Sequence, residues 1–109
     1  MSHTEALKLI HAEAGESGLV VDARMGRDID PKRVARLVSA IRVVTDSLRG
    51  ADSLDSELAA ALHVLGFLVS REAESWASRT QKLPKVVFDS LISLESAVED
   101  LFFDISRRV

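Results

Sequence analysis

Residues 84–105 read PKVVFDSLISLESAVEDLFFDI, and their apolar positions repeat with the period of an α-helix. Large apolar side chains recur at alternating steps of four and three, which places them on one side of a helix. This stripe consists of Val87, Leu91, Leu94, Val98, Leu101 and Ile105. Pro84 suits a helix start, because the first helical N–H has no partner to lose. The pattern predicts a helix from Pro84 to about Arg108 that packs along the stripe.

A second apolar strip lies outside that stripe. It consists of Phe88, Ile92, Phe102 and Phe103, with Glu95 and Glu99 along its edge. A helix in a small bundle normally has one apolar stripe and one hydrated face. The strip therefore needs cover, either from the rest of this chain or from another molecule.

The preceding helix, predicted from about Ser53 to Arg79, has the same property. Its inner stripe is Leu54, Leu58, Leu62, Leu65, Val69 and Trp76. At about 100° per residue, the opposite side carries Ser56, Ala59, Ala60, His63, Phe67, Ser70 and Glu74. Gly66 costs a helix about 1 kcal/mol relative to alanine, which indicates a close contact at that point. Trp76 is predicted to close the end of the core.

Two further helices are predicted in the N-terminal half. One begins at Pro31 with Asp30 as its cap and ends at Gly50. Its stripe is Val34, Leu37, Ile41, Val44 and Leu48. The other runs from about His3 to Ala14, is capped by Ser2 with Glu5 in a capping box, and ends at Gly15.

Residues 15–30 are predicted to form an extended loop. Leu19, Val20 and Val21 have strand propensity, but the chain offers no second β-rich run to pair with them. Whether residues 19–21 form a strand stays open at this level. The expected fold is an all-α, four-helix bundle-like domain spanning residues 1–109, with one short helix, three longer ones and this loop.

Composition limits the class of protein. Hydrophobic residues make up 47% and charged residues 28%, which is typical of an ordered globular chain. Cysteine is absent, so disulfides and thiolate metal sites are excluded. No signal peptide is recognisable at Met1, and the longest nearly apolar run, Leu58 to Val69, is too short to cross a bilayer. We expect a cytoplasmic protein.

Charge is unevenly distributed along the chain. Residues 24–49 hold seven basic and three acidic residues, a net charge of +4, and residues 51–104 hold ten acidic and four basic, a net charge of −6. The two parts either complement each other within the fold or leave a basic surface for an acidic partner. For the second case, the predicted partner-binding residues are Arg24, Arg27, Arg33 and Arg36.

No catalytic or metal motif stands out. Glu95, Glu99, Asp100 and Asp104 have helical spacing, as in all-α nucleotide pyrophosphatases, but the neighbouring helix adds only Glu72 and Glu74, on different sides. The three histidines lack zinc-ligand spacing. We therefore expect no metal, no cofactor and no enzymatic activity. The helix after the basic one is too apolar for a recognition helix, so nucleic-acid binding is not expected.

These observations favour a small acidic protein that acts by protein–protein binding, as an inhibitor, an immunity or antitoxin-like protein, a chaperone or an adaptor. We expect a two-fold homodimer, because the first helix is too short to cover both long ones. The predicted interface is Ala60, His63, Phe67, Phe88, Ile92 and Phe103. A nucleotide hydrolase with a helical carboxylate site, or a DNA-associated regulator that uses the basic helix, are the alternatives.

Overall fold

The computed structural model describes residues 1–79 and 83–107, which contain helices and no strand. The all-α, bundle-like fold predicted from the sequence is confirmed. The helices are α1 (His3–Ala14), α2 (Leu19–Arg24), α3 (Pro31–Ser47), α4 (Ser56–His63), the π-helical turn η1 (Val64–Leu68), α5 (Val69–Arg79) and α6 (Lys85–Ser106).

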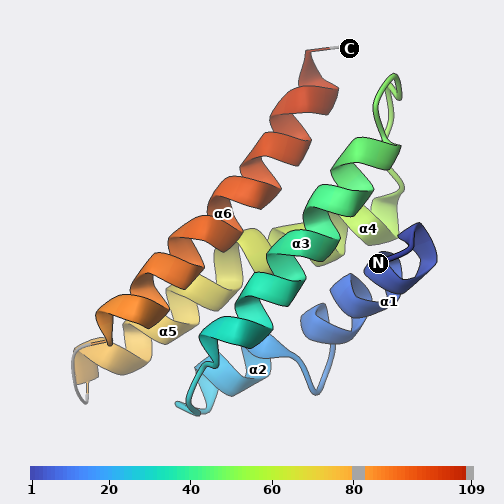
Figure 1. Cartoon of the computed structure of the whole chain (residues 1–109). Coiled ribbons are helices and arrows are strands. Elements are labelled where there is room, and N and C mark those ends of the chain that lie inside the picture. Colours follow the sequence, from blue (N-terminus) through green and yellow to red (C-terminus); the bar gives the residue numbers. More distant parts are fainter. Residues whose placement is uncertain (80–82, 108–109) are drawn as a thin grey trace.

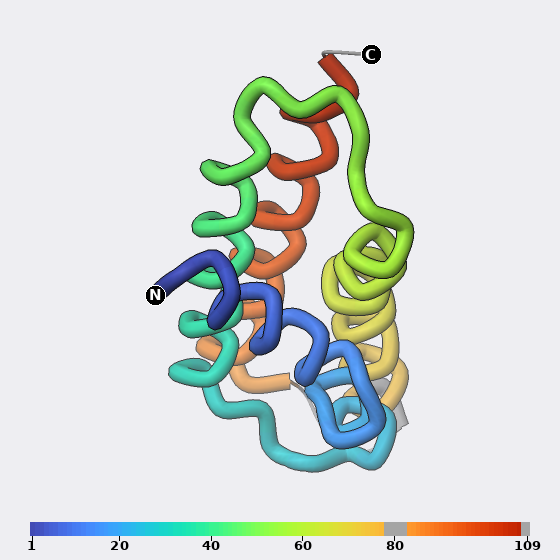
Figure 2. Tube along the Cα trace, turned by 90° about the vertical axis from the view of Figure 1, so that its right-hand side faces the viewer, coloured from blue at the N-terminus to red at the C-terminus, as the bar shows by residue number. Residues whose placement is uncertain are grey.

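Three long helical segments form the body of the fold. In Figure 1, α3 and α6 lie side by side, and α4, η1 and α5 follow one another as a single arm behind them. Helix α6 contacts both α3 and η1. Figure 2 shows α1 crossing from α3 toward the arm, where it contacts α4, while α2 packs against α5. The two short N-terminal helices therefore close the side of the bundle that α6 leaves open.

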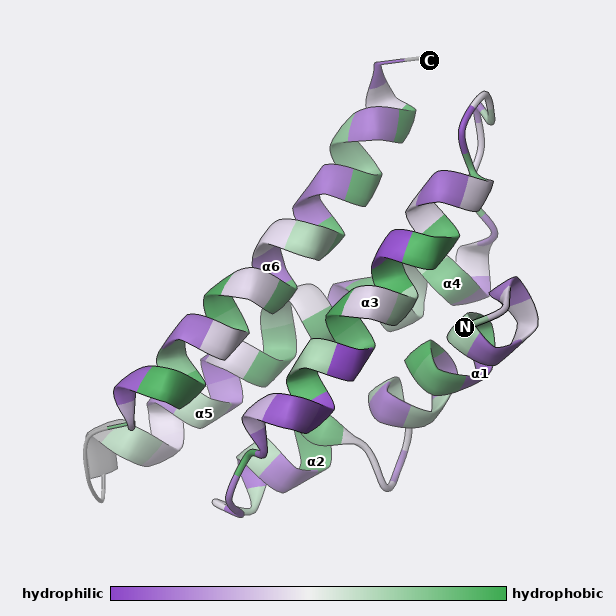
Figure 3. Cartoon of the chain, viewed as in Figure 1, coloured by the Kyte–Doolittle hydropathy of each residue, from purple (hydrophilic) through white to green (hydrophobic). Residues whose placement is uncertain are grey.

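The amphipathic stripes predicted from the sequence meet in one hydrophobic core. All six members of the α6 stripe are buried, and so are Val34, Leu37, Ile41 and Val44 of α3, whereas Leu48 is half-buried. Figure 3 shows hydrophobic and hydrophilic residues following one another along each ribbon, as expected for helices with one face on a core.

The predicted starts of α1 and α3 are correct, and a capping residue marks each of them. Ser2 Oγ accepts a hydrogen bond from the Glu5 N–H (3.1 Å), and Asp30 Oδ1 accepts one from the Lys32 N–H (2.9 Å). Helix α1 ends at Ala14 as predicted, and α3 ends at Ser47. Gly50, in the turn after α3, has a φ of +87°, a conformation that glycine adopts without steric cost.

The extended loop predicted for residues 15–30 is wrong, because residues 19–24 form helix α2. Leu19, Val20 and Ala23 are buried there, and this burial outweighs the weak β-propensity of valine. Gly18 allows the helix to begin close to α1: a Cβ atom at this position would lie 1.9 Å from the Glu13 carbonyl oxygen. Packing of α2 against α5, which is distant in the sequence, accounts for the burial of these residues, and the local sequence does not reveal it.

The continuous α-helix predicted from Ser53 to Arg79 is also wrong in detail. It begins at Ser56, where Asp55 is the cap, and a π turn interrupts it, with the Val69 N–H donating to the Val64 carbonyl five residues back. The extra residue rotates the rest of the helical arm by about 100°. Ser70, predicted to face outward, is therefore buried with Ala73, while Trp76, predicted in the core, is 39% exposed.

Gly66 lies within this π turn and faces α6 at close range. A Cβ atom added to Gly66 would lie 2.6 Å from Val98 Cγ1, closer than two carbon atoms can approach. The close contact expected at Gly66 is confirmed, and its partner is the middle of the α6 stripe.

Replacing Gly66 by alanine tests this contact. Helix propensity alone predicts a gain in stability of about 1 kcal/mol. We expect the overlap with Val98 to outweigh that gain, so the free energy of unfolding in urea should fall by about 1–2 kcal/mol. In a Val98→Ala background the two γ-methyl groups are gone and only the Cβ atom remains, 2.8 Å from the added methyl group, so the same change should cost less than it does in the wild type. A stabilised Gly66→Ala single variant would contradict the close approach.

Candidate functional site

The large apolar side chains on the surface of α6 and η1 form the candidate site. Phe67, Phe88, Ile92 and Phe103 are each between 45% and 60% exposed, and Phe102 is 37% exposed. Ala60 and His63 are exposed as well. We call these seven residues the aromatic face. It contains every residue of the interface predicted from the sequence, and the rest of the described chain leaves all seven accessible.

The contact between Gly66 and Val98 brings the two halves of this face together. At about 100° per residue, His63 and Phe67 lie next to Gly66 on the side away from the buried Leu62. On α6, Glu95 and Phe102 lie next to Val98, also on the side away from the core. Both rows thus border the same helix–helix contact from outside, so α4, η1 and α6 present them on one side of the molecule.

Charged and aromatic groups are interleaved on this face. The rings of His63 and Phe67 stack with their centroids 5.4 Å apart and an interplanar angle of 19°. The Arg71 guanidinium carbon lies 6.0 Å from the centre of the Phe67 ring, and that of Arg107 lies 4.5 Å from the Phe103 ring. Such cation–π contacts contribute about 0.5–1 kcal/mol at exposed positions. They orient the exposed rings without covering them.

The carboxylates of α6 do not converge. Asp100 Oδ2 lies 3.4 Å from Arg42 Nη1 of α3, on the flank of α6 away from Phe102. Within the described part of the chain, no three His, Asp or Glu side chains gather closely enough to hold a metal ion.

The predicted partner-binding arginines are spread over α2, α3 and the loop between them. Arg24 Nε lies 3.4 Å from Glu72 Oε1 of α5, and Arg27 Nη1 lies 3.0 Å from Asp22 Oδ1. Arg36 is exposed on α3. With Arg42 bound to Asp100, two arginines of the basic segment pair with acidic residues of the C-terminal half. These pairs favour complementary charges within the fold, and a contact of Arg24, Arg27 or Arg36 with a partner stays a prediction.

Arg33, the fourth of these arginines, is partly buried and joins three helices. Its Nε donates to Glu13 Oε2 of α1 (2.7 Å) and its Nη1 to Asp22 Oδ2 of α2 (2.6 Å). Glu13 is only 6% exposed, so its charge depends on this bidentate partner. Sequence reasoning missed this cluster, because Glu13, Asp22 and Arg33 are too far apart along the chain to share a local spacing pattern.

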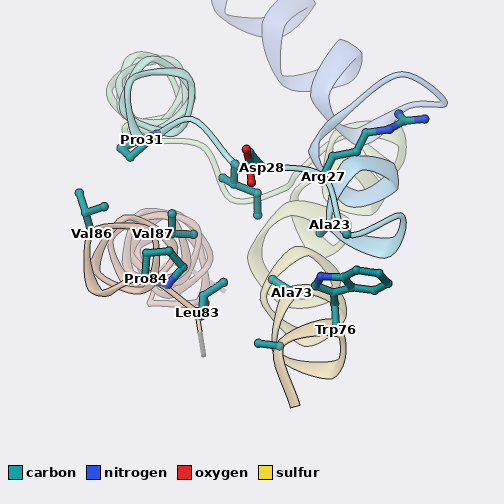
Figure 4. Close-up of a pocket in the computed structure, with 13 residues that line it drawn as sticks. Ala23, Arg27, Asp28, Pro31, Ala73, Trp76, Leu83, Pro84, Val86 and Val87 are labelled. Carbon is teal, nitrogen blue, oxygen red and sulfur yellow. The ribbon is translucent and has the colours of Figure 1, made fainter. Parts of the chain in front are cut away.

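A pocket of about 600 Å³ lies where α3 and α6 begin (Figure 4). Apolar residues from α2, α5, α6 and the start of α3 line it, and the indole of Trp76 forms one wall against Gly26. Its two charged residues are Arg27, which extends away from the pocket and is bound to Asp22, and Asp28. The pocket is thus mainly apolar.

Comparison with known proteins found no matching family model, curated protein or solved structure. None of the helices in residues 1–79 and 83–107 combines the length and apolar composition that a bilayer crossing requires. Function must therefore be argued from the geometry of the surface itself.

Replacing Arg33 by methionine tests the buried cluster. Its loss leaves Glu13 without its charged partner, so the free energy of unfolding at neutral pH should fall by about 2 kcal/mol, less than for a fully buried pair because Arg33 is partly exposed. Hydrogen bonds from Arg33, and then from Arg27, hold the pKa of Asp22 below 3.8. That stabilisation is present above pH 3.8 and is lost as the pH falls through the lowered pKa.

The difference between wild type and Arg33→Met should accordingly shrink in urea titrations repeated at about pH 3. Arg36→Met, on the exposed side of the same helix, is the control and should change stability by less than about 0.5 kcal/mol. An Arg33→Met loss no larger than that of the control would contradict the structural role of the cluster.

Gly26 provides a test of the Trp76 wall. Its φ is +70°, and a Cβ atom there would lie 2.2 Å from Trp76 Cε2. We expect Gly26→Ala to reduce the free energy of unfolding by more than about 2 kcal/mol and to shift the emission of Trp76, the only tryptophan in the chain, to longer wavelength as the indole moves into water.

Gly50→Ala is the matched control for Gly26→Ala. Gly50 has a similar positive φ of +87°, but a Cβ atom added there would have nothing within 4 Å. It should therefore show the backbone cost alone, about 1–2 kcal/mol, with unchanged tryptophan emission. Equal effects of the two substitutions would mean that Trp76 does not pack on Gly26.

Proposed function

We propose that this protein acts by protein–protein binding through the aromatic face, and that the face also holds two copies together as a two-fold homodimer. One observation carries this proposal. Phe67, Phe88, Ile92 and Phe103 are exposed on the same two helical segments that supply much of the core. Single exposed apolar residues are ordinary, but a contiguous set of this kind marks an interaction surface.

The energy available from this face is moderate. Complete burial of a large apolar side chain contributes about 1.5–3 kcal/mol, so a half-exposed one has roughly 1 kcal/mol left to gain. A two-fold interface uses each residue twice. Five such side chains per copy then contribute on the order of 10 kcal/mol, within the range of the cost of association. With the cost of association at its lower end, about 4 kcal/mol, about 6 kcal/mol of net stabilisation remains, which corresponds to a dissociation constant of tens of micromolar. We therefore expect a weak dimer, which a second protein with a better fit can displace.

Proteins that work by occupying another protein's surface include inhibitors, immunity or antitoxin-like proteins, chaperones and adaptors. The proposal covers this group as a whole, because a small helical fold with an apolar face is common to its members and the fold by itself selects none of them. Aromatic residues flanked by charges suit such a role, since buried aromatics supply affinity and the surrounding charges favour the correct partner.

A nucleotide hydrolase and a DNA-associated regulator draw no support from a specific observation. A hydrolase would need converging carboxylates, and Asp100 is paired with Arg42. A DNA-associated regulator would use the basic surface of α3, where Arg33 is engaged by Glu13 and Asp22. Protein–protein binding is therefore the function that the surface supports best.

Serine substitutions on the aromatic face test the homodimer. Sedimentation equilibrium at 1–200 µM (a range of about two decades around the expected constant) should give a mass between monomer and dimer for the wild type. Phe67→Ser and Phe103→Ser should each weaken self-association at least about tenfold, because each removes two buried rings per dimer.

Met25→Ser is the control, because Met25 is 58% exposed but lies at the end of α2, away from the aromatic face. It should leave self-association unchanged. A wild-type protein that sediments as a monomer throughout this range would rule out the homodimer. Serine variants that associate as strongly as Met25→Ser would show that two copies meet elsewhere.

A further inference from the structure

We propose that the two-fold axis of the homodimer runs parallel to α6, so that η1 and α5 of each copy lie over α6 of the other, with Arg71 of one copy paired with Glu95 of the other. This inference rests on the homodimer proposed above and adds its geometry. It follows from the signs of the charges on the aromatic face and from the positions of these charges along the helix axes.

A face made of two antiparallel helical segments can meet its own copy in two ways. The α4–η1–α5 arm and α6 run in opposite directions (Figures 1 and 2). An axis across the helices places α6 over α6 and arm over arm. An axis along the helices places each arm over the partner copy's α6. A two-fold interface permits both, so residue chemistry must decide between them.

Arg71 of α5 and the two carboxylates Glu95 and Glu99 of α6 have opposite sign, while Arg107 adds a positive charge near Phe103 at the end of α6. Arg71 is exposed, and its guanidinium lies over the Phe67 ring. Glu95 and Glu99 lie along the strip of α6 that carries Phe88, Ile92 and Phe102. Among the residues that the structure describes, none of these three charged side chains forms an ion pair. They are therefore available to a second molecule.

A two-fold axis across the helices would bring side chains of like charge from the two copies close together. Glu95 and Glu99 of both copies would meet near the axis, four carboxylates in one apolar interface, and the two Arg71 side chains would lie in the opposite half. Like charges brought together at an interface suppress association. An axis along the helices instead brings each Arg71 to the helix that carries Glu95 and Glu99. Charge complementarity thus selects the second arrangement.

The levels of the residues along the helices agree with this pairing. Gly66 and Val98 lie at the same level, because they are in contact. At about 1.5 Å per residue, Arg71 lies about 7 Å from that level toward the α5 end. Glu95 lies about 4 to 5 Å from it in the same direction, since α6 runs the opposite way. Rotation about an axis along the helices preserves these levels, and Arg71 therefore arrives within half a turn of Glu95.

Charge reversal tests the pairing by sedimentation equilibrium. Arg71→Glu and Glu95→Arg should each raise the dimer dissociation constant about tenfold or more, because each replaces an attraction by a repulsion. The double variant Arg71→Glu/Glu95→Arg restores the opposite pairing and should return to within about threefold of the wild type. Arg36→Glu, on the exposed surface of α3, makes the same change in net charge as Arg71→Glu and should have no effect.

The outcomes separate this inference from the homodimer itself. If Phe67→Ser weakens the dimer but the two charge reversals fail to compensate each other, the homodimer stands and the axis along the helices is wrong. If the single reversals have no more effect than Arg36→Glu, the pairing is likewise wrong. If the wild type is a monomer, the homodimer fails and this geometry with it. Circular dichroism of each variant establishes that loss of association is not loss of fold.

Discussion

The close approach of Gly66 to Val98 is the constraint on which the rest of the structure depends. Here the helical arm comes so near to α6 that no side chain fits between them, and the hydrogen-bond pattern of the arm changes to a π turn. Single π turns are uncommon in helices and are frequent at functional sites. In this protein the π turn rotates α5 relative to α4, so that the two parts of one arm present different sides to the core.

This rotation decides which apolar residues are left outside. Leu58 and Leu62 of α4 are buried in the core before the turn, and Leu65 is buried within it. After the turn, Val69, Ser70 and Ala73 are the buried residues. The Ser70 hydroxyl is buried without a hydrogen-bond partner among the described residues, which is a cost that burial of its neighbours must offset. Phe67 lies at the turn itself, on the outer side. The same feature that packs Gly66 on Val98 thus holds an aromatic ring at the edge of α6.

Much of the fold could be predicted because its signals are local. Ser2, Asp30 and Pro84 mark helix starts through backbone chemistry within three residues, and the 4–3 spacing on α6 identifies every buried member of its stripe. Helix α2 and the π turn could not be predicted, since each depends on packing against a segment that is distant in the sequence, α2 on α5 and Gly66 on α6. The glycines themselves were the available signal, and only Gly66 was interpreted as a close contact.

The exposed apolar residues of the candidate site could be predicted better than the contacts of the arginines, for a physical reason. Phe67, Phe88 and Phe103 lie outside the packing stripes of their own helices, so periodicity alone marks them as residues that need cover from elsewhere, and the structure leaves them exposed. The role of an arginine depends on which carboxylate the fold brings to it. Arg33 forms ion pairs with Glu13 and Asp22 within the N-terminal half, whereas the guanidinium of Arg71 lies beside an exposed aromatic ring.

This contrast locates the surface that remains available for recognition. The N-terminal helices use their strongest ionic groups to hold α1, α2 and α3 together, and Arg24 and Arg42 bind Glu72 and Asp100 of the C-terminal helices. Charges already satisfied within one chain contribute little to binding another, because each must first give up its present partner. Charged side chains without an ion pair lie next to the exposed aromatic rings on α6 and beside η1. Because these charges adjoin exposed apolar area, this side of the molecule is the one suited to binding a second protein.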